Sequence, residues 1–172
     1  RLPSLEDRIP VLRPQLVRLD ADVLCLQEIC GQRDRGRKRR LEAMNRLLEC
    51  TPYEGYKRVN TIDPNTREVF DHHNLVILSR YDIVQNNQYL HEYAPSPRYK
   101  KVTAIPEEVE AREISWERPI LHARIRLPNN MIVDVINLHL KSRRPPAYRG
   151  INWMRGPGRL PPDGRRGYSY RP

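Results

Sequence analysis

The 172-residue chain has little aromatic content besides tyrosine and no long apolar run. One Phe stands beside nine Tyr, and 30% of the residues are charged, which is polar for a globular enzyme. No run approaches the roughly 18 apolar residues that a membrane-spanning helix needs, and no signal-peptide pattern opens the chain. We therefore expect no transmembrane segment. The compartment stays open, because a signal could precede Arg1.

Cysteines are few and odd in number, which is unlike a disulfide framework. The three are Cys25, Cys30 and Cys50. Cys25 lies inside an apolar segment and is predicted to be a small core residue. Reduced thiols fit an intracellular protein, and this is the one feature that favours the cytoplasm.

The net charge of +10 is unevenly distributed. Residues 143–172 hold eight Arg and one Asp, a net charge of +7, which leaves +3 for residues 1–142. The same final segment holds five of the eight Gly and six of the sixteen Pro, with little apolar periodicity. It is predicted to be disordered. We consider two interpretations of this segment. It is either the out-of-frame product of a GC-rich coding sequence or a basic arm that contacts phosphates.

Apolar periodicity predicts a helix over residues 5–19, with Ser4 and Asp7 as a capping box. Pro10 and Pro14 predict a kinked or broken helix, because each removes a backbone donor. The other expected elements, in chain order, are a strand at 22–29, a basic loop at 31–40, a helix at 41–49, strands at 53–60, 74–79 and 83–89, an unpatterned segment at 94–116, and a hairpin of strands 119–127 and 131–140.

Two of the apolar strands end in polar residues. The strand at 22–29 carries Glu28 near its end, and the strand at 131–140 carries Asn137 and His139. Burying an ionised carboxylate costs several kcal/mol unless a partner or metal compensates it. A hard divalent cation is one such partner for Glu28. The second strand is apolar on both faces, as in a sheet covered on each side.

Four motifs in order carry a family resemblance. They are Leu-Gln-Glu at 26–28, Asn-Leu-Val-Ile-Leu-Ser-Arg at 74–80, Arg-Pro at 118–119 and Asn-Leu-His-Leu-Lys-Ser at 137–142. The set resembles the endonuclease/exonuclease/phosphatase superfamily, which includes deoxyribonucleases, abasic-site endonucleases, sphingomyelinases and inositol polyphosphate 5-phosphatases. The resemblance covers most of residues 1–142.

This resemblance implies an α/β fold, part of a four-layer sandwich of two packed mixed sheets flanked by helices, with the active site at one end. The chain is expected to supply about one sheet and its helices. The family's first-strand Asn would precede Arg1, and its later Gly-Asp-Xaa-Asn and Ser-Asp-His motifs would follow Pro172. Residues 1–142 are therefore interpreted as the N-terminal portion of the domain, truncated and inactive alone.

The resemblance also implies roles for five residues. Glu28 would bind Mg²⁺, with Mn²⁺ as a substitute; the alternative is a strand-end Glu in solvent. His139 would donate to a phosphate oxygen or protonate the leaving oxygen. Asn137 shares its strand face and is expected to orient the site rather than react. Arg118 and Asn74 would lie at the substrate phosphate. The alternative for Arg118 is a surface residue in a charged loop.

Two polar clusters are assigned to solvated loops. Asp71, His72 and His73 are adjacent, so their side chains should point to opposite faces and not share a metal. The basic run at 33–40 is typical of a solvated loop. Because it follows the Glu28 strand, contact with a polyanionic substrate is its alternative.

The sequence thus predicts a Mg²⁺-dependent phosphoesterase, a nuclease or phosphatase, in which water attacks phosphorus. DNA, RNA, a phospholipid head group and an inositol phosphate all remain open as substrate. Two other classes stay open as well. One is a non-catalytic basic protein that binds nucleic acid or anions, and the other is a product without a stable fold. Oligomeric state is not predicted.

Overall fold

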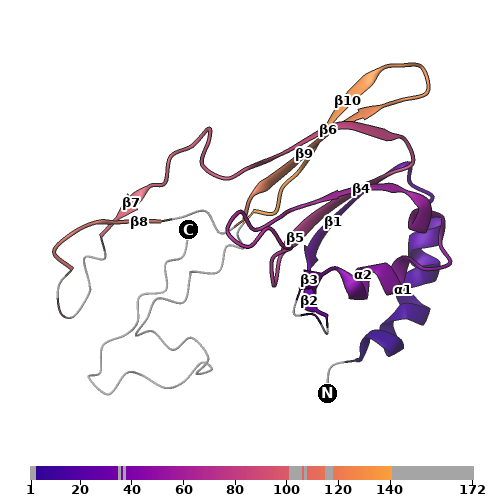
Figure 1. Cartoon of the computed structure of the whole chain (residues 1–172), viewed down its shortest axis with the longest axis horizontal. Coiled ribbons are helices and arrows are strands. Elements are labelled where there is room, and N and C mark those ends of the chain that lie inside the picture. The colour runs from indigo at the N-terminus through magenta and orange to yellow at the C-terminus, as the bar shows by residue number, and fades with distance from the viewer. Residues whose placement is uncertain are drawn as a thin grey trace, which may run out of the picture. The chain divides into compact units, whose positions relative to one another are not determined.

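A computed structural model describes residues 3–34, 36, 38–100, 106, 108–114 and 118–140. The predicted disordered segment at 143–172 lies outside these residues. The elements are α1 Leu5–Leu19, β1 Val23–Ile29, β2 Gln32–Arg33, β3 Arg39–Arg40, α2 Glu42–Leu48, the 3-10 helix η1 Pro52–Gly55, β4 Lys57–Asn60, β5 Asn74–Ser79, β6 Asp82–Tyr89, β7 Arg98–Tyr99, β8 Arg112–Glu113, β9 Ile120–Arg126 and β10 Ile132–Asn137 (Figure 1).

The main strands form two three-stranded sheets with the orders β1-β5-β4 and β10-β9-β6. The short strands form two ribbons, β2-β3 and β7-β8. Every pairing between described strands is antiparallel. The hairpin predicted at 119–140 is confirmed as β9 and β10, in which Ile132 pairs with Arg126 and Asn137 with Leu121.

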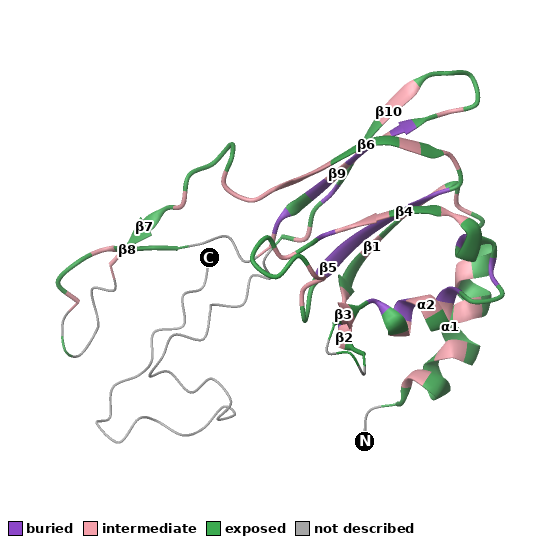
Figure 2. Ribbon diagram, in the orientation of Figure 1, coloured by how far each residue is buried: buried purple, intermediate pink, exposed green. Residues whose placement is uncertain are grey.

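The two sheets pack face to face through their central strands. Leu75 and Ile77 of β5 meet Leu121, Ala123 and Ile125 of β9 in one buried cluster. Side chains alternate along a strand, so the intervening β5 residues face the opposite side. Figure 2 shows β5 buried along its whole length. Its central position, covered on both faces, explains its apolar run at 75–78.

A second buried cluster lies on the other face of the first sheet. Val76 and Leu78 of β5 pack there against Met44 and Leu48 of α2, with the buried Tyr53 of η1. In Figure 1, α1 and α2 lie on this side of the sheet. The described residues therefore form three layers, helix, sheet and sheet.

Helix α1 spans the predicted residues, and its capping box is confirmed. The backbone N–H of Asp7 donates to the Ser4 hydroxyl (3.2 Å), and the Ser4 N–H donates to the Asp7 carboxylate (2.9 Å). The predicted break does not occur, because Pro10 and Pro14 lie within one continuous helix. Both prolines are exposed and four residues apart, so they share the solvent side, where water satisfies the freed carbonyl groups.

The α/β class is confirmed, but the expected contribution of about one sheet is wrong. The chain supplies strands to two packed sheets. The expectation that the strand at 131–140 is covered on both faces is also wrong, since β10 is an edge strand and Ile136 is 60% exposed. Within the described residues, no helix packs on the outer face of the β10-β9-β6 sheet.

Two smaller expectations need correction. The strand predicted at 53–60 begins as η1 and becomes β4 only at Lys57, because Thr51 caps a short turn that buries Tyr53. Cys25 is exposed rather than in the core, since β1 is also an edge strand. Among the described helices, none has the length and apolar character to cross a membrane.

Candidate active site

Four strand ends meet at one end of the paired sheets. The last residue of β1, Ile29, pairs with the first residue of β5, Asn74. The last residue of β10, Asn137, pairs with Leu121 near the start of β9. The two pairs are connected, because Asn137 donates across the interface between the sheets. The polar residues singled out in the sequence therefore gather at one edge of the molecule.

Asn137 is buried and binds both neighbouring strands of the first sheet. Its side-chain Nδ2 donates to the carbonyl oxygens of Leu26 in β1 (2.9 Å) and Val76 in β5 (3.1 Å). Its Oδ1 accepts a long bond from Gln27 (3.4 Å), whose amide also donates to the Leu138 carbonyl (2.8 Å). These bonds fix where β10 ends and support an orienting role for Asn137. That Asn137 orients an active site stays a prediction.

Asn74 is fully buried, and its amide group is occupied by the protein. Nδ2 donates to the carbonyl oxygens of Ile29 and Phe70, both at 2.8 Å, and Oδ1 accepts from the Phe70 N–H (2.8 Å). The side chain thus closes the loop before β5 and fastens it to the end of β1. This geometry supports a positioning role and does not support the predicted direct contact with a phosphate.

Glu28 projects from an irregularity in β1. The pairing of β1 with β5 changes register between Leu26 and Ile29, and Glu28 has a left-handed backbone with φ of 57°. Non-glycine residues adopt this conformation uncommonly, and such residues concentrate at functional sites. The Glu28 side chain is 60% exposed, so its carboxylate is open to solvent and to a ligand.

Two imidazole rings flank the Glu28 carboxylate. Its Oε1 lies 3.6 Å from Nε2 of His139 and 3.7 Å from Nδ1 of His73. The two ring centroids are 6.4 Å apart. Both distances exceed a normal hydrogen bond, so both rings approach the same carboxylate oxygen without hydrogen-bonding to it. We call Glu28, His73 and His139 the strand-end cluster.

His139 is the least exposed member of this cluster, at 20% of its side chain. Its Nδ1 is buried and has no hydrogen-bond partner among the described residues. A buried polar atom without a partner is costly and calls for an explanation, such as a catalytic role or a bound ion. The structure thus places His139 beside Glu28, as a shared site requires.

Sequence reasoning missed His73. The alternation rule was applied to an extended segment, but His73 has a left-handed backbone with φ of 63°, which alternation does not describe. Because Asn74 points inward, His73 turns outward toward Glu28. The Asp71-His72-His73 segment is therefore a loop, as expected, but its third residue reaches the site. No local sequence signal reports this turn.

The β2-β3 ribbon supports the loop that carries His73. The Gly31 N–H donates to the Asp71 carbonyl (2.8 Å), and a Cβ at Gly31 would lie 2.4 Å from the Phe70 carbonyl oxygen. Arg39 forms an ion pair with Asp71 and donates to the Gly31 carbonyl (3.1 Å). Only glycine permits this close approach of two backbones.

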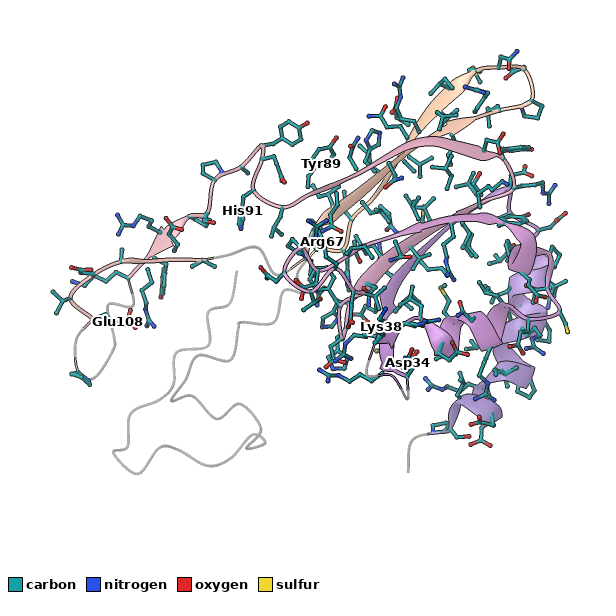
Figure 3. All side chains as sticks on the ribbon, viewed as in Figure 1. Asp34, Lys38, Arg67, Tyr89, His91 and Glu108 are labelled. Atoms are coloured by element: carbon teal, nitrogen blue, oxygen red, sulfur yellow. The ribbon has the colours of Figure 1, made fainter. Side chains whose placement is uncertain are left out.

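The basic run at 33–40 is partly neutralised by these contacts. Arg39 pairs with Asp71, and Arg40 pairs with Asp34 (3.2 Å). Figure 3 shows Asp34 and Lys38 side by side at the turn of the ribbon, where the Lys38 N–H donates to the Asp34 carboxylate (3.0 Å). In the described part of this run, Arg39 and Arg40 are thus paired with carboxylates, which favours the solvated-loop interpretation over a polyanion site.

Arg118 lies at the same end of the second sheet as His139. It is half-buried and precedes the buried Pro119 and the first residue of β9, Ile120. Because Leu121 pairs with Asn137, the start of β9 adjoins the end of β10. This position is compatible with the predicted contact to a phosphate, which stays a prediction.

Glu28 has the chemistry to hold a hard divalent cation. It offers an exposed carboxylate, and Mg²⁺ keeps several waters while accepting one or two protein carboxylates. The described residues contain no group of three or more His, Cys, Asp or Glu side chains spaced to hold a metal. The fit is therefore that of one ligand in a water-rich coordination shell.

A cavity of about 470 Å³ lies elsewhere, on the helix-covered side of the first sheet. Its lining includes Tyr53, Tyr56 and Arg58, and the Arg58 guanidinium donates to the side chain of Asn45 (2.7 Å). No member of the strand-end cluster lines it. The size of this cavity therefore gives no information on the strand-end cluster.

Comparison with known proteins gave one similar structure. No protein-family model matches the chain, and no curated protein matches it. Among solved structures, the chain is similar to an endonuclease/exonuclease/phosphatase from Beutenbergia cavernae DSM 12333, with 16% identity and a TM-score of 0.44. The match covers 81% of this chain and 34% of that one, so the chain spans about a third of that protein.

Proposed function

We propose that the strand-end cluster is part of the active site of a divalent-cation-dependent phosphoesterase. One observation carries the proposal: Glu28 Oε1 lies 3.6 Å from His139 Nε2, although Glu28 lies in β1 of one sheet and His139 follows β10 of the other, 111 positions along the chain. The family resemblance assigned both residues to one active site, Glu28 as a metal ligand and His139 as a donor to the phosphate or leaving oxygen. A Mg²⁺ or Mn²⁺ ion at Glu28 would supply positive charge for a phosphate oxygen.

The remaining residues have roles that follow from their contacts. His139 would hold a proton at Nε2 for a phosphate or leaving oxygen. Asn137 and Asn74 would fix the strand ends on which His139 and Glu28 stand. Arg118 would add a guanidinium at the same end of the second sheet. The substrate class within phosphate esters is left open by these residues.

This chain alone is expected to hydrolyse phosphate esters at close to the background rate. Its described residues offer Glu28 without further metal ligands in place, and catalysis of this kind depends on several positioned groups acting together. Binding is therefore a better test than turnover. EDTA-sensitive turnover well above background would show that another group, such as one from a partner chain, completes the site.

The test measures binding of a short fluorescent oligonucleotide in Mg²⁺ and in EDTA across a range of salt concentrations. The proposal predicts a component of binding that requires Mg²⁺ and is lost in Glu28→Gln. A matched control is Glu49→Gln, which removes one exposed carboxylate from the end of α2. Binding that survives EDTA, falls steeply with salt and ignores Glu28→Gln would instead support the non-catalytic basic protein.

A further inference from the structure

His73 is an exposed imidazole beside the Glu28 carboxylate, and the predicted set of site residues does not include it. Its side chain is 48% exposed, and its Nδ1 lies 3.7 Å from Glu28 Oε1. The distance is too long for a hydrogen bond, so this contact does not fix the ring as a structural element. His73 differs in this from its neighbour Asn74, whose amide is buried and fully bonded.

The backbone places His73 and Glu28 together. Ile29 pairs with Asn74 in an antiparallel ladder, so Glu28 and His73, which directly precede these two residues, lie diagonally across the pair. Both have positive φ, 57° and 63° respectively. Non-glycine residues in this conformation cost free energy and persist where the surrounding structure requires them. The paired turns bring the two side chains to the same point.

The loop that carries His73 is fastened on both sides. Asn74 bonds to Phe70 and Ile29 on one side, and Asp71 is tied to Gly31 and Arg39 on the other. Because the loop is already held in place, a ligand that binds the His73 ring loses little free energy to ordering the loop. Such preorganisation favours binding.

The cluster combines one carboxylate with two imidazoles around a common point. A carboxylate alone repels a phosphate, but a divalent cation at Glu28 would reverse that effect. Imidazole N–H groups then serve as donors to anionic oxygens. His73 and His139 approach the same Oε1, so they flank the space that a phosphate beside Glu28 would occupy.

We propose that His73 is a phosphate-binding residue of this site, which donates a ring N–H to a non-bridging oxygen of the phosphate ester held beside Glu28. The proposal rests on the function proposed above and deepens it. Asn74 was predicted from the sequence to contact the phosphate. The proposal assigns that contact to His73, the residue directly before Asn74. The contact depends on the cation, because without it the Glu28 carboxylate opposes the anion.

The test is a titration of the ¹⁵N-labelled 172-residue chain with inorganic phosphate in Mg²⁺ at constant ionic strength, followed through the imidazole ¹H–¹⁵N signals. The signals of His73 and His139 should shift on one saturable curve. His73→Asn should raise the dissociation constant of phosphate about fivefold or more, the effect of losing a hydrogen bond to a charged group. Asparagine tolerates the left-handed backbone at this position.

His72→Asn is the matched control. His72 is adjacent to His73 and also exposed, and its Nε2 lies 3.6 Å from the Asp71 carboxylate. The His72→Asn substitution should leave the dissociation constant of phosphate within about twofold of the value for the unchanged chain. The amide fingerprint of each variant reports whether it remains folded, and His73→Gln is the second variant if the first does not. In EDTA, the difference between His73→Asn and the unchanged chain should disappear.

Two results would overturn the inference, and they are distinguishable. If Glu28→Gln and His139→Ala weaken phosphate binding but His73→Asn does not, the site stands and His73 is no part of it. If phosphate shifts only arginine signals and none of the three substitutions matters, the proposed function fails together with the inference.

Discussion

The polar residues at the strand ends form two groups that differ in exposure and in hydrogen bonding. Asn74 and Asn137 are 0% and 2% exposed, and their amides bond to backbone carbonyls of neighbouring strands. Glu28 and His73 are 60% and 48% exposed and form no short bonds with each other. The first group is used to hold the chain, and the second is left open. Polar residues close together in sequence can therefore serve stability and ligand binding separately.

The largest effect on stability is expected from Asn74→Ala. The substitution removes the side-chain partner of the Ile29 and Phe70 carbonyls and of the Phe70 N–H in a part-buried site. Each unsatisfied buried group costs about 1–3 kcal/mol, so the free energy of unfolding should fall by about 3 kcal/mol or more. Urea denaturation measures this loss. Asn65→Ala, in an exposed turn, should change it by less than about 0.5 kcal/mol.

An Asn74→Ala variant as stable as the original chain would contradict this division. In that case the amide would be free for a ligand, and the predicted contact with phosphate would return.

His139→Ala should act on chemistry more than on stability. In a form of the protein that turns over substrate, kcat should fall by about 10²-fold or more, because a general acid is lost, while KM changes little. A structural histidine would behave differently. Lost thermal stability at near-normal turnover would place His139 with Asn74 and Asn137, the residues that hold the chain.

The fold was more predictable from sequence than the site. Helix α1 was predicted from apolar residues repeating with the helical period of 3.6, and strand β5 from its run of apolar residues. The capping box was predicted from the spacing of Ser4 and Asp7. That this chain supplies strands to both sheets was missed, because it depends on contacts between β5 and β9, which lie far apart in the chain. Local patterns report which face is apolar, but not what covers it.

The candidate site was predictable where a strand pattern ends in a polar residue, as at Glu28 and His139. Asn74 was assigned to the ligand although it is buried, since sequence alone does not tell an inward amide from an outward one. His73 was missed because its position depends on a left-handed turn fixed by bonds from Asn74, Gly31 and Asp71.

A smaller effect on stability is expected from Gly31→Ala. Gly31 contacts the loop that carries both the buried Asn74 and the exposed His73. Its Cβ would lie 2.4 Å from the Phe70 carbonyl oxygen, so the loop before β5 must shift. We expect a loss of about 1–3 kcal/mol in the free energy of unfolding. Amide shifts should concentrate at residues 70–74. Shifts confined to the β2-β3 turn would show that the ribbon does not position His73.

The central claim, that Glu28 is a divalent-cation ligand at an open strand-end site, is tested most directly by Mn²⁺ in the ¹⁵N-labelled chain. Paramagnetic broadening should be strongest for amides at residues 27–30, 72–75 and 138–140. Glu28→Gln keeps the size and hydrogen-bonding capacity of the side chain, and it should abolish that broadening with the rest of the spectrum unchanged. Broadening that persists at the strand ends in Glu28→Gln, or that centres elsewhere in the original chain, would contradict the account.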